Sequence, residues 1–191
     1  MPFSFKQCAS ANGKIIEGLF EIFPKVFDDS RGYFFESYSQ RDFAAAGLGM
    51  NFVQDNQSCS KKGVLRGLHF QKKYPQGKLV RVIQGEIFDV AVDLRPASAS
   101  YGKWYAVILN EKKQNQFYIP PGFAHGFLVL SEICIFVYKC TDFYHPDDEG
   151  GIIWNDPAIG INWPDLDIEY ILSDKDKKLP SFSAFSIGDT K

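Results

Sequence analysis

Residues 63–93 read GVLRGLHFQKKYPQGKLVRVIQGEIFDVAVD, and this stretch decides how the fold is interpreted. Apolar residues alternate with polar ones along much of it, and glycine or proline separates its segments, which is typical of short β-strands joined by turns. The Gln84–Gly85 step predicts a hairpin. The expected strands lie at residues 64–70, 78–83 and 86–94.

Polar side chains that can act as acids, bases or hydrogen-bond partners lie on these expected strands: Arg66, His69, Lys78 and Asp89. Residues two apart share a strand face, so His69 and Gln71 point the same way. Arg66 falls on the opposite face unless Gly67 bends the strand. A polar set on the inner face of a β-barrel is a candidate site, and we interpret the rest of the chain as the structure that closes it.

Composition places the chain among ordinary globular proteins. Its 191 residues suffice for one domain with a sizeable core, and 16% aromatic residues favour a β-rich one. The net charge of -2 argues against a nucleic-acid partner, and no apolar run is long enough to predict a membrane span. The N-terminus does not resemble a signal peptide. Four cysteines without CxxC spacing indicate reduced thiols in a cytoplasmic protein.

The remaining chain predicts more short strands and one helix. Residues 39–47, SQRDFAAAG, predict the helix, with Ser39 as its cap and Gly47 at its end. Many short strands with Gly and Pro turns and no repeat predict one all-β domain, residues 1–191, built as a sandwich or barrel. We expect a lead-in at 1–14 that is either loose or partly a pairing segment, and an irregular tail at 179–191. Further strands are expected at 15–27, as one or two strands, and at 33–39, 103–110 and 134–144. Residues 117–131 predict two strands separated by a Pro-Pro-Gly corner.

The corner PxGxxH at Pro120, Gly122 and His125 resembles the second sequence motif of cupins, a jelly-roll family whose two sheets enclose a cavity. Many cupins hold a metal through an H-x-H pair, but Gly67 stands two positions before His69. Two histidines alone supply fewer ligands than zinc or iron sites usually have. The sequence therefore predicts no metal, and chemistry by organic acids and bases.

The strand residues also have ordinary structural interpretations. His69 can be a core histidine, and Lys78 with Arg81 can form a solvated edge. Their functional interpretation is chemical, because histidine titrates near neutrality and suits a general base, and a buried lysine can stabilise a developing oxyanion. An inward Asp89 would need a partner, for which Lys78 and His125 are the candidates.

Other polar residues stand out less by pattern. Tyr138 lies among apolar residues, as core tyrosines do, and Asp174 and Asp176 belong to a charge run that would ordinarily be solvated. Arg31 and Arg66 are candidates for forked contacts to a diphosphate. Neither GxGxxG nor a Walker A motif is present, so neither a nicotinamide cofactor nor ATP is indicated.

Longer segments match one family in order. The sequence resembles the dTDP-4-dehydrorhamnose 3,5-epimerase family from about residue 20 to residue 180. RGLHFQ, PxGFAHGF and WNDPxIGIxWP are highly specific. The matching segments are DDSRGYFFESY, FVQDNQS, GVLRGLHFQ, QGKLVRVIQGEIFDVAVDLR, YIPPGFAHGFLVLSE, FVYKCTDFYHPDDEGGIIWNDPAIGINWP and LSDKD.

The resemblance implies a cupin-fold homodimer that needs no cofactor, of a family in which N-terminal strands are often shared between subunits. Its substrate would be a dTDP-4-dehydro-6-deoxyhexose. By motif position, His69 would be the base, Asp176 its partner, Tyr138 the acid and Lys78 the group that stabilises the enolate. Asp89 is similar to the family's buried partner near His125. The implied substrate contacts are Arg31, Glu36, Gln54, Asp55, Asn56, Arg66, Lys78, His125, Glu149 and Lys175.

Other functions stay open at this point. Relatives of the family invert only carbon 3 or carbon 5 of another deoxysugar, and a ketoisomerase on the same fold is a further option. A non-catalytic cupin that binds a nucleotide sugar would need the arginines and aromatic residues. It would not need a His–Asp pair with a facing tyrosine.

Overall fold

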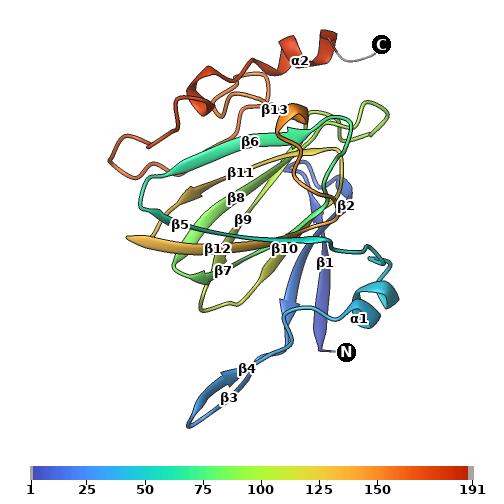
Figure 1. Ribbon diagram of the computed structural model, residues 1–191, viewed down its shortest axis with the longest axis vertical. Helices are drawn as coiled ribbons and strands as arrows, with labels where there is room; N and C mark the ends of the chain where they lie inside the picture. Colours follow the sequence, from blue (N-terminus) through green and yellow to red (C-terminus); the bar gives the residue numbers. More distant parts are fainter. Residues whose placement is uncertain (1, 189–191) are drawn as a thin grey trace.

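Two antiparallel β-sheets form the body of the molecule in a computed structural model that describes residues 2–188 (Figure 1). In spatial order, the six-stranded sheet contains β1 (Phe3–Ala9), β2 (Ile15–Pro24), β10 (Gln116–Ile119), β7 (Lys78–Gln84), β12 (Ile133–Cys140) and β5 (Gln54–Lys61). The five-stranded sheet contains β13 (Glu149–Gly151), β6 (Leu65–Gln71), β11 (Phe123–Val129), β8 (Glu86–Asp93) and β9 (Trp104–Asn110). This arrangement confirms the all-β fold class.

Side chains that alternate along the strands fill the space between the sheets. The six-stranded sheet contributes Val80, Phe117 and Phe136, and the five-stranded sheet contributes Ile87 and Leu109, each of them buried. Burying one such side chain contributes about 1.5–3 kcal/mol. The apolar core fills only part of the space between the sheets. Polar side chains that point inward lie in the part that the core leaves.

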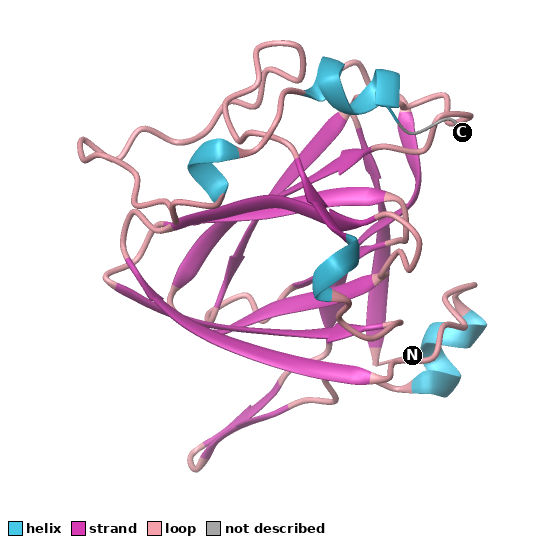
Figure 2. Ribbon diagram, turned by 45° about the horizontal axis from the view of Figure 1, so that its top comes forward, coloured by secondary structure: helices cyan, strands magenta, loops and turns pink. Residues whose placement is uncertain are grey.

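The helical segments lie around the strands, as Figure 2 shows. They are α1 (Gln40–Ala45), α2 (Phe182–Gly188) and the 3₁₀ turns η1 (Pro146–Asp148) and η2 (Asp176–Lys178). The predicted helix is confirmed, because Asp42 N donates to the capping Ser39 Oγ at 3.4 Å. Among residues 2–188, none of the helices has the length and apolar character required to cross a membrane.

The predicted hairpin at Gly85 is wrong. β7 pairs with β10 and β12, whereas β8 pairs with β11 and β9, so the chain crosses from one sheet to the other at Gly85. Gly85 has a φ of +87°, and a Cβ there would collide with the carbonyl oxygen of Ile133. A tight glycine turn can connect two strands of one sheet as a hairpin, or two strands that belong to different sheets. The local sequence does not distinguish the two connections.

The structure also decides three other expectations. The lead-in is a pairing segment and not loose chain, because Phe3–Ala9 form β1, which pairs with β2. No element was expected at 54–61, where β5 forms the opposite edge of the same sheet. The tail contains α2, while residues 189–191 lie outside the described part of the chain. β5 carries polar residues on both faces, and its backbone pairing with β12 holds it at the edge of the sheet.

A two-stranded hairpin projects from the body (Figure 1). It consists of β3 (Phe27–Asp29) and β4 (Gly32–Phe34), so the strand expected at 33–39 ends early. Phe27, Tyr33 and Phe34 are 51%, 59% and 68% exposed. Isolated two-stranded hairpins are marginally stable in water, and this one is tied to the body by the Gln114 Nε2 hydrogen bond to the Tyr33 hydroxyl at 3.2 Å.

Candidate active site

His69 and Asp176 form a close pair. His69 Nε2 on β6 lies 2.6 Å from Asp176 Oδ1 on η2, and Asp176 is only 4% exposed. The solvated interpretation of the 174–176 charge run is therefore wrong for Asp176. Burial alone would raise the pKa of Asp176, but the hydrogen bond with His69 lowers it below its usual value. An ionised carboxylate only accepts, so it holds the neutral ring's proton on Nε2 and leaves a lone pair on Nδ1.

A bulge brings Arg66 and His69 to the same cavity. His69 pairs with His125 while Arg66 pairs with Phe127, so β6 holds one extra residue between these pairs. A Cβ at Gly67 would lie 2.6 Å from the Gly126 Cα atom, which only glycine avoids. The sequence predicted that Arg66 and His69 would face the same side only if Gly67 bends the strand, and this bulge is that bend.

The cavity lies between the sheets and has a volume of about 570 Å³. Each sheet supplies reactive side chains to it. β6 and β11 provide His69 and His125, and β7 and β12 provide Lys78 and Tyr138. Four side chains that are far apart in the sequence therefore meet in one space, as the strand pattern predicted for His69 and Lys78.

A second histidine–carboxylate pair lies in the wall of this cavity. His125 Nε2 lies 2.9 and 3.0 Å from the two carboxylate oxygens of Asp89, which is fully buried. Burial raises the pKa of Asp89 and lowers those of His125 and Lys78, while the nearby carboxylates of Asp89 and Glu149 oppose the shift at Lys78. Of the two partners considered for Asp89, His125 makes the hydrogen bond and Lys78 is a neighbouring charge.

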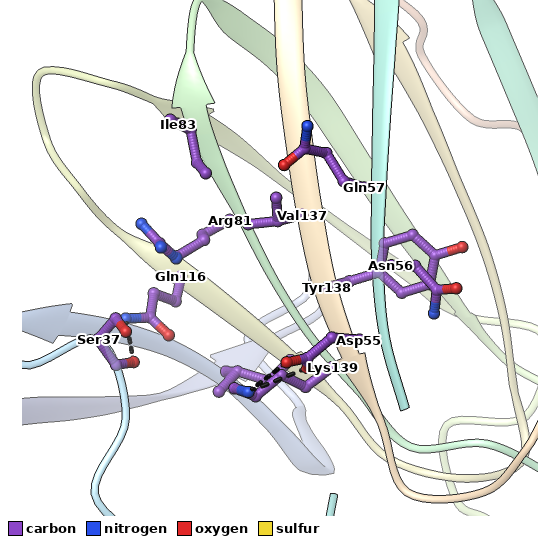
Figure 3. Close-up of a pocket in the computed structure, with 11 residues that line it drawn as sticks. Ser37, Asp55, Asn56, Gln57, Arg81, Ile83, Gln116, Val137, Tyr138 and Lys139 are labelled. Atoms are coloured by element: carbon purple, nitrogen blue, oxygen red, sulfur yellow. Dashed lines mark hydrogen bonds and ion pairs between the residues drawn. The ribbon is translucent and has the colours of Figure 1, made fainter. Parts of the chain in front are cut away.

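Tyr138 remains a phenol at neutral pH. Burial raises its pKa. Its ring packs against Phe136, with ring centroids 5.6 Å apart. Figure 3 shows Tyr138 pointing to the opposite side of its sheet from Arg81. The side chain is therefore a protonated donor that faces the cavity.

The residues implied as substrate contacts divide into several groups. Arg66, Lys78, His125, Asn56 and Lys175 line the cavity. Gln54 donates to Asn56 Oδ1 at 3.0 Å. Asp55 instead faces outward, where Lys139 Nζ lies 2.9 Å from its Oδ1 (Figure 3).

Two implied contacts pair with each other beside the cavity. Glu149 Oε2 accepts from Lys175 Nζ at 2.6 Å and from the Tyr144 hydroxyl at 2.7 Å. Tyr144 is not among the site residues predicted from the sequence, although it lies in FYHPDD, five residues before Glu149. Burial would raise the pKa of Glu149, but the hydrogen bonds from Lys175 and Tyr144 lower it.

Arg31 and Glu36 are not brought to the cavity of their own chain. Arg31 lies between β3 and β4 at the tip of the projecting hairpin, where its Nη2 is 2.7 Å from Asp29 Oδ2. Glu36 follows the hairpin and is exposed. Neither residue lines the inter-sheet cavity. In the described residues, 2–188, no three or more His, Cys, Asp or Glu side chains are grouped as metal ligands.

Comparison with known proteins agrees with the motifs. The family described as dTDP-4-dehydrorhamnose 3,5-epimerase matches residues 14–184. A protein of that name from Methanothermobacter thermautotrophicus is 55% identical over 163 residues, covering 85% of this chain and 88% of the relative. The one from Escherichia coli K12 is 53% identical over 166 residues, covering 86% and 89%. The predicted enzyme class, an epimerase, is thereby confirmed.

Solved structures share the fold. RmlC from Legionella pneumophila in complex with dTDP-4-keto-L-rhamnose superimposes with a TM-score of 0.88 at 46% identity, covering 94% of this chain and 92% of that one. ChmJ, a 3'-monoepimerase from Streptomyces bikiniensis in complex with dTDP-quinovose, gives 0.84 at 34% identity, covering 91% and 88%. The chain therefore belongs to the dTDP-4-dehydrorhamnose 3,5-epimerase family.

Proposed function

We propose that this enzyme inverts carbons 3 and 5 of dTDP-4-dehydro-6-deoxy-D-glucose to give dTDP-4-dehydro-L-rhamnose, a step of dTDP-L-rhamnose biosynthesis in the cytoplasm. One observation carries the proposal: the His69–Asp176 pair and Tyr138 line the same cavity, with Lys78 also in its wall. Inversion needs a base on one face of a carbon and an acid on the other. The cavity contains both.

The mechanism follows from the position of the ketone. Carbons 3 and 5 flank the C4 carbonyl, so loss of either proton places negative charge on the C4 oxygen. In our proposal His69 takes the proton and becomes an imidazolium paired with Asp176, while the Lys78 ammonium stabilises the enolate oxygen. Tyr138 then gives its proton to the opposite face of the carbon. Proton return from His69 to Tyr138 through solvent restores both groups, so the reaction consumes no co-reactant.

Arg66 is the proposed diphosphate contact. Its guanidinium lines the cavity, and its Nη2 and Nε donate to Ser60 Oγ at 3.2 and 3.4 Å. Guanidinium groups match phosphate oxygens bidentately. Asn56 and His125 are proposed contacts from the cavity wall, and Gln54 acts with Asn56. In the proposal, Glu149 and Lys175 exchange part of their mutual pairing for substrate, whereas Asp55 faces away from the cavity and does not contact substrate there.

We further propose that the enzyme is a homodimer in which Arg31 and Glu36 of one copy reach the cavity of the other. The projecting hairpin carries Arg31 and the exposed ring of Phe34, and Glu36 follows it by two residues. The outer face of the six-stranded sheet supports the same arrangement. A hollow of about 370 Å³ there is lined by Arg81 and by the fully buried Gln116 (Figure 3).

That hollow contains an unmet hydrogen-bonding requirement. Gln116 Nε2 donates to the Ser37 carbonyl at 2.8 Å, whereas its Oε1 is buried and, within the described part of the chain, accepts no hydrogen bond. Arg81 lies over the Phe35 ring, 5.8 Å from its centroid. A buried acceptor without a partner costs about 1–3 kcal/mol. Because the Gln116 oxygen is closed off within this chain, the hollow around Arg81, and not that oxygen, is the surface that this proposal offers to a second copy.

Proton exchange tests the activity. The enzyme is incubated with dTDP-4-dehydro-6-deoxy-D-glucose in heavy water, deuterium at carbons 3 and 5 is read by NMR, and the product is trapped by a reductase. We expect label at both carbons and an L-configured product, and His69→Ala should lose on the order of 100-fold or more in turnover. Label at one carbon only would indicate a mono-epimerase. No exchange despite binding would indicate a binding protein.

The dimer is tested by light scattering after gel filtration. We expect a dimer for the wild type and a monomer for Phe34→Glu, because a charge in an apolar contact is not solvated. Ile168→Glu is the matched control, since Ile168 is 48% exposed in the C-terminal segment, away from the hairpin. A monomeric wild type that is fully active would refute the proposed role of Arg31 and Glu36.

A further inference from the structure

The segment that carries Asp176 covers the outer face of the five-stranded sheet. We call residues 152–185 the cap segment; it runs along the top of Figure 1 in orange and red. Ile152 and Ile159 of this segment are buried against Leu68 and Val90 of the sheet, and Phe185 packs with them. Asp176 reaches His69 from this cap, so the geometry of the pair depends on how the cap is held.

The cap segment is held on both sides of Asp176: by the start of β6 on the N-terminal side, and on the C-terminal side by its own first residues, where Ile152 N donates to the Leu68 carbonyl of β6 at 3.0 Å. On the N-terminal side, Ile171 N donates to the Gly63 carbonyl at 2.8 Å, and Leu65 N donates to the Ile171 carbonyl at 3.0 Å. These bonds fix the chain against the start of β6. On the C-terminal side, the Pro180 carbonyl accepts from Ile153 N at 2.9 Å. The η2 turn therefore lies within a short span whose two ends are held separately.

Asp156 completes the attachment on the C-terminal side. Its Oδ2 accepts from Phe182 N at 2.8 Å, and its Oδ1 accepts from Ala158 N at 2.8 Å. Its carbonyl accepts from Gly160 N at 2.9 Å. Asp156 is 3% exposed and is not among the residues that line the cavity. A buried carboxylate that accepts backbone N–H groups makes charge-assisted hydrogen bonds, which are the stronger kind.

We infer that Asp156 is a positioning residue for the His69–Asp176 pair: it holds residues 180–182 in place and thereby fixes η2, which carries Asp176. The inference rests on the proposed function, because Asp156 affects the reaction only if His69 is the catalytic base. The pair joins two atoms at 2.6 Å, and such a contact tolerates little displacement. A misplacement of about 1 Å in a catalytic group can cost about 100-fold in rate.

Matched substitutions isolate this role. Asp156→Ala removes both side-chain acceptors, and Asp156→Asn keeps one, so the two variants should form a graded pair. Asp165→Asn is the control within the same cap segment, because Asp165 is exposed and accepts only within its own turn, from Asp167 N at 3.0 Å. Should Asp156→Ala fail to fold, Phe182→Pro removes the same hydrogen bond from the donor side. Proline is favoured at the first position of a helix, which Phe182 occupies.

The readouts separate positioning from general loss of structure. We expect Asp156→Ala to lower kcat on the order of tenfold or more, with Asp156→Asn intermediate and Asp165→Asn unchanged. The Kd for dTDP should stay within twofold in each variant, because Arg66, the proposed diphosphate contact, lies on β6 and outside the cap segment. The low-field proton signal of the His69 ring N–H should weaken in Asp156→Ala and persist in Asp165→Asn.

The inference and the proposed function fail differently. A wild-type enzyme without proton exchange overturns the proposed function. Given an active wild type, an Asp156→Ala variant with wild-type kcat overturns the inference. A second result would also overturn the inference: Asp156→Ala loses dTDP affinity and activity in parallel while the His69 N–H signal stays intact. The same result for Phe182→Pro, where that variant is used in its place, would overturn it too.

Discussion

Asp176→Asn tests the candidate site most directly, because asparagine keeps the shape of the side chain and removes its charge. Asp176 is 4% exposed and its Oδ1 lies 2.6 Å from His69 Nε2. A hydrogen bond to a charged group contributes about 1.5–3 kcal/mol. One factor of ten in rate corresponds to about 1.4 kcal/mol. If Asp176 stabilises the imidazolium formed at His69, loss of the Asp176 charge should lower turnover by roughly 10- to 100-fold.

The assay is deuterium incorporation at carbons 3 and 5 in heavy water, with the Kd for dTDP measured alongside it. We expect both exchange rates to fall together while dTDP affinity is unchanged. Asp174→Asn is the control, because the Asp174 side chain is 92% exposed two residues away. An Asp176→Asn enzyme within twofold of the wild type, or an equal loss in Asp174→Asn, would refute the assignment of Asp176 as partner of the base.

Three further predictions concern the acid, a buried carboxylate and pH. Tyr138→Phe should keep deuterium exchange on the His69 side while inverted product falls by about 100-fold; equal losses of exchange and trapped product would contradict this. Asp93→Asn should lower the free energy of unfolding by about 3 kcal/mol in urea at pH 7, because Asp93 is fully buried and accepts hydrogen bonds from Arg95, Ser98 and Ser100. Burial would raise the pKa of Asp93, but these bonds lower it. Its contribution is therefore present above about pH 4 and lost as pH falls through the lowered pKa, so the wild-type advantage over Asp93→Asn should shrink below about pH 4. An advantage that grows on acidification would contradict this sign.

Much of the fold was predictable because local signals and tertiary structure agree. The strands at 64–70 and 78–83 alternate as half-buried strands do, and the structure places β6 and β7 there. The helix capped by Ser39 follows from capping chemistry. β5 was missed for a physical reason: as an edge strand over a polar cavity it carries polar residues on both faces, so it shows no hydrophobic alternation.

The site was predictable from the residues only in part. His69 and Lys78 stood out because polar groups interrupt apolar strands. Asp176 did not, since its neighbours Asp174 and Lys175 are exposed and burial by a distant strand leaves no mark in the local sequence. Only the resemblance of LSDKD to the family singled it out. The sheet crossing at Gly85 was invisible for the same reason, because pairing partners far apart in the sequence decide it.

The two-sheet architecture suits the stereochemistry of the proposed reaction. His69 comes from the five-stranded sheet and Asp176 from its cap, whereas Tyr138 and Lys78 come from the six-stranded sheet. A sugar ring held between the sheets would present one face to the base and the other to the acid. Carbons 3 and 5 flank the same ketone, so a single base, a single acid and one lysine serve both centres if the ring can turn between them.

Whether one carbon or two is inverted would then depend on the freedom of the ring in the cavity rather than on additional catalytic groups. Substitutions in the cavity wall, such as at Asn56, should therefore change the ratio of deuterium at the two carbons more than substitutions at His69 do, since loss of the base lowers both rates alike.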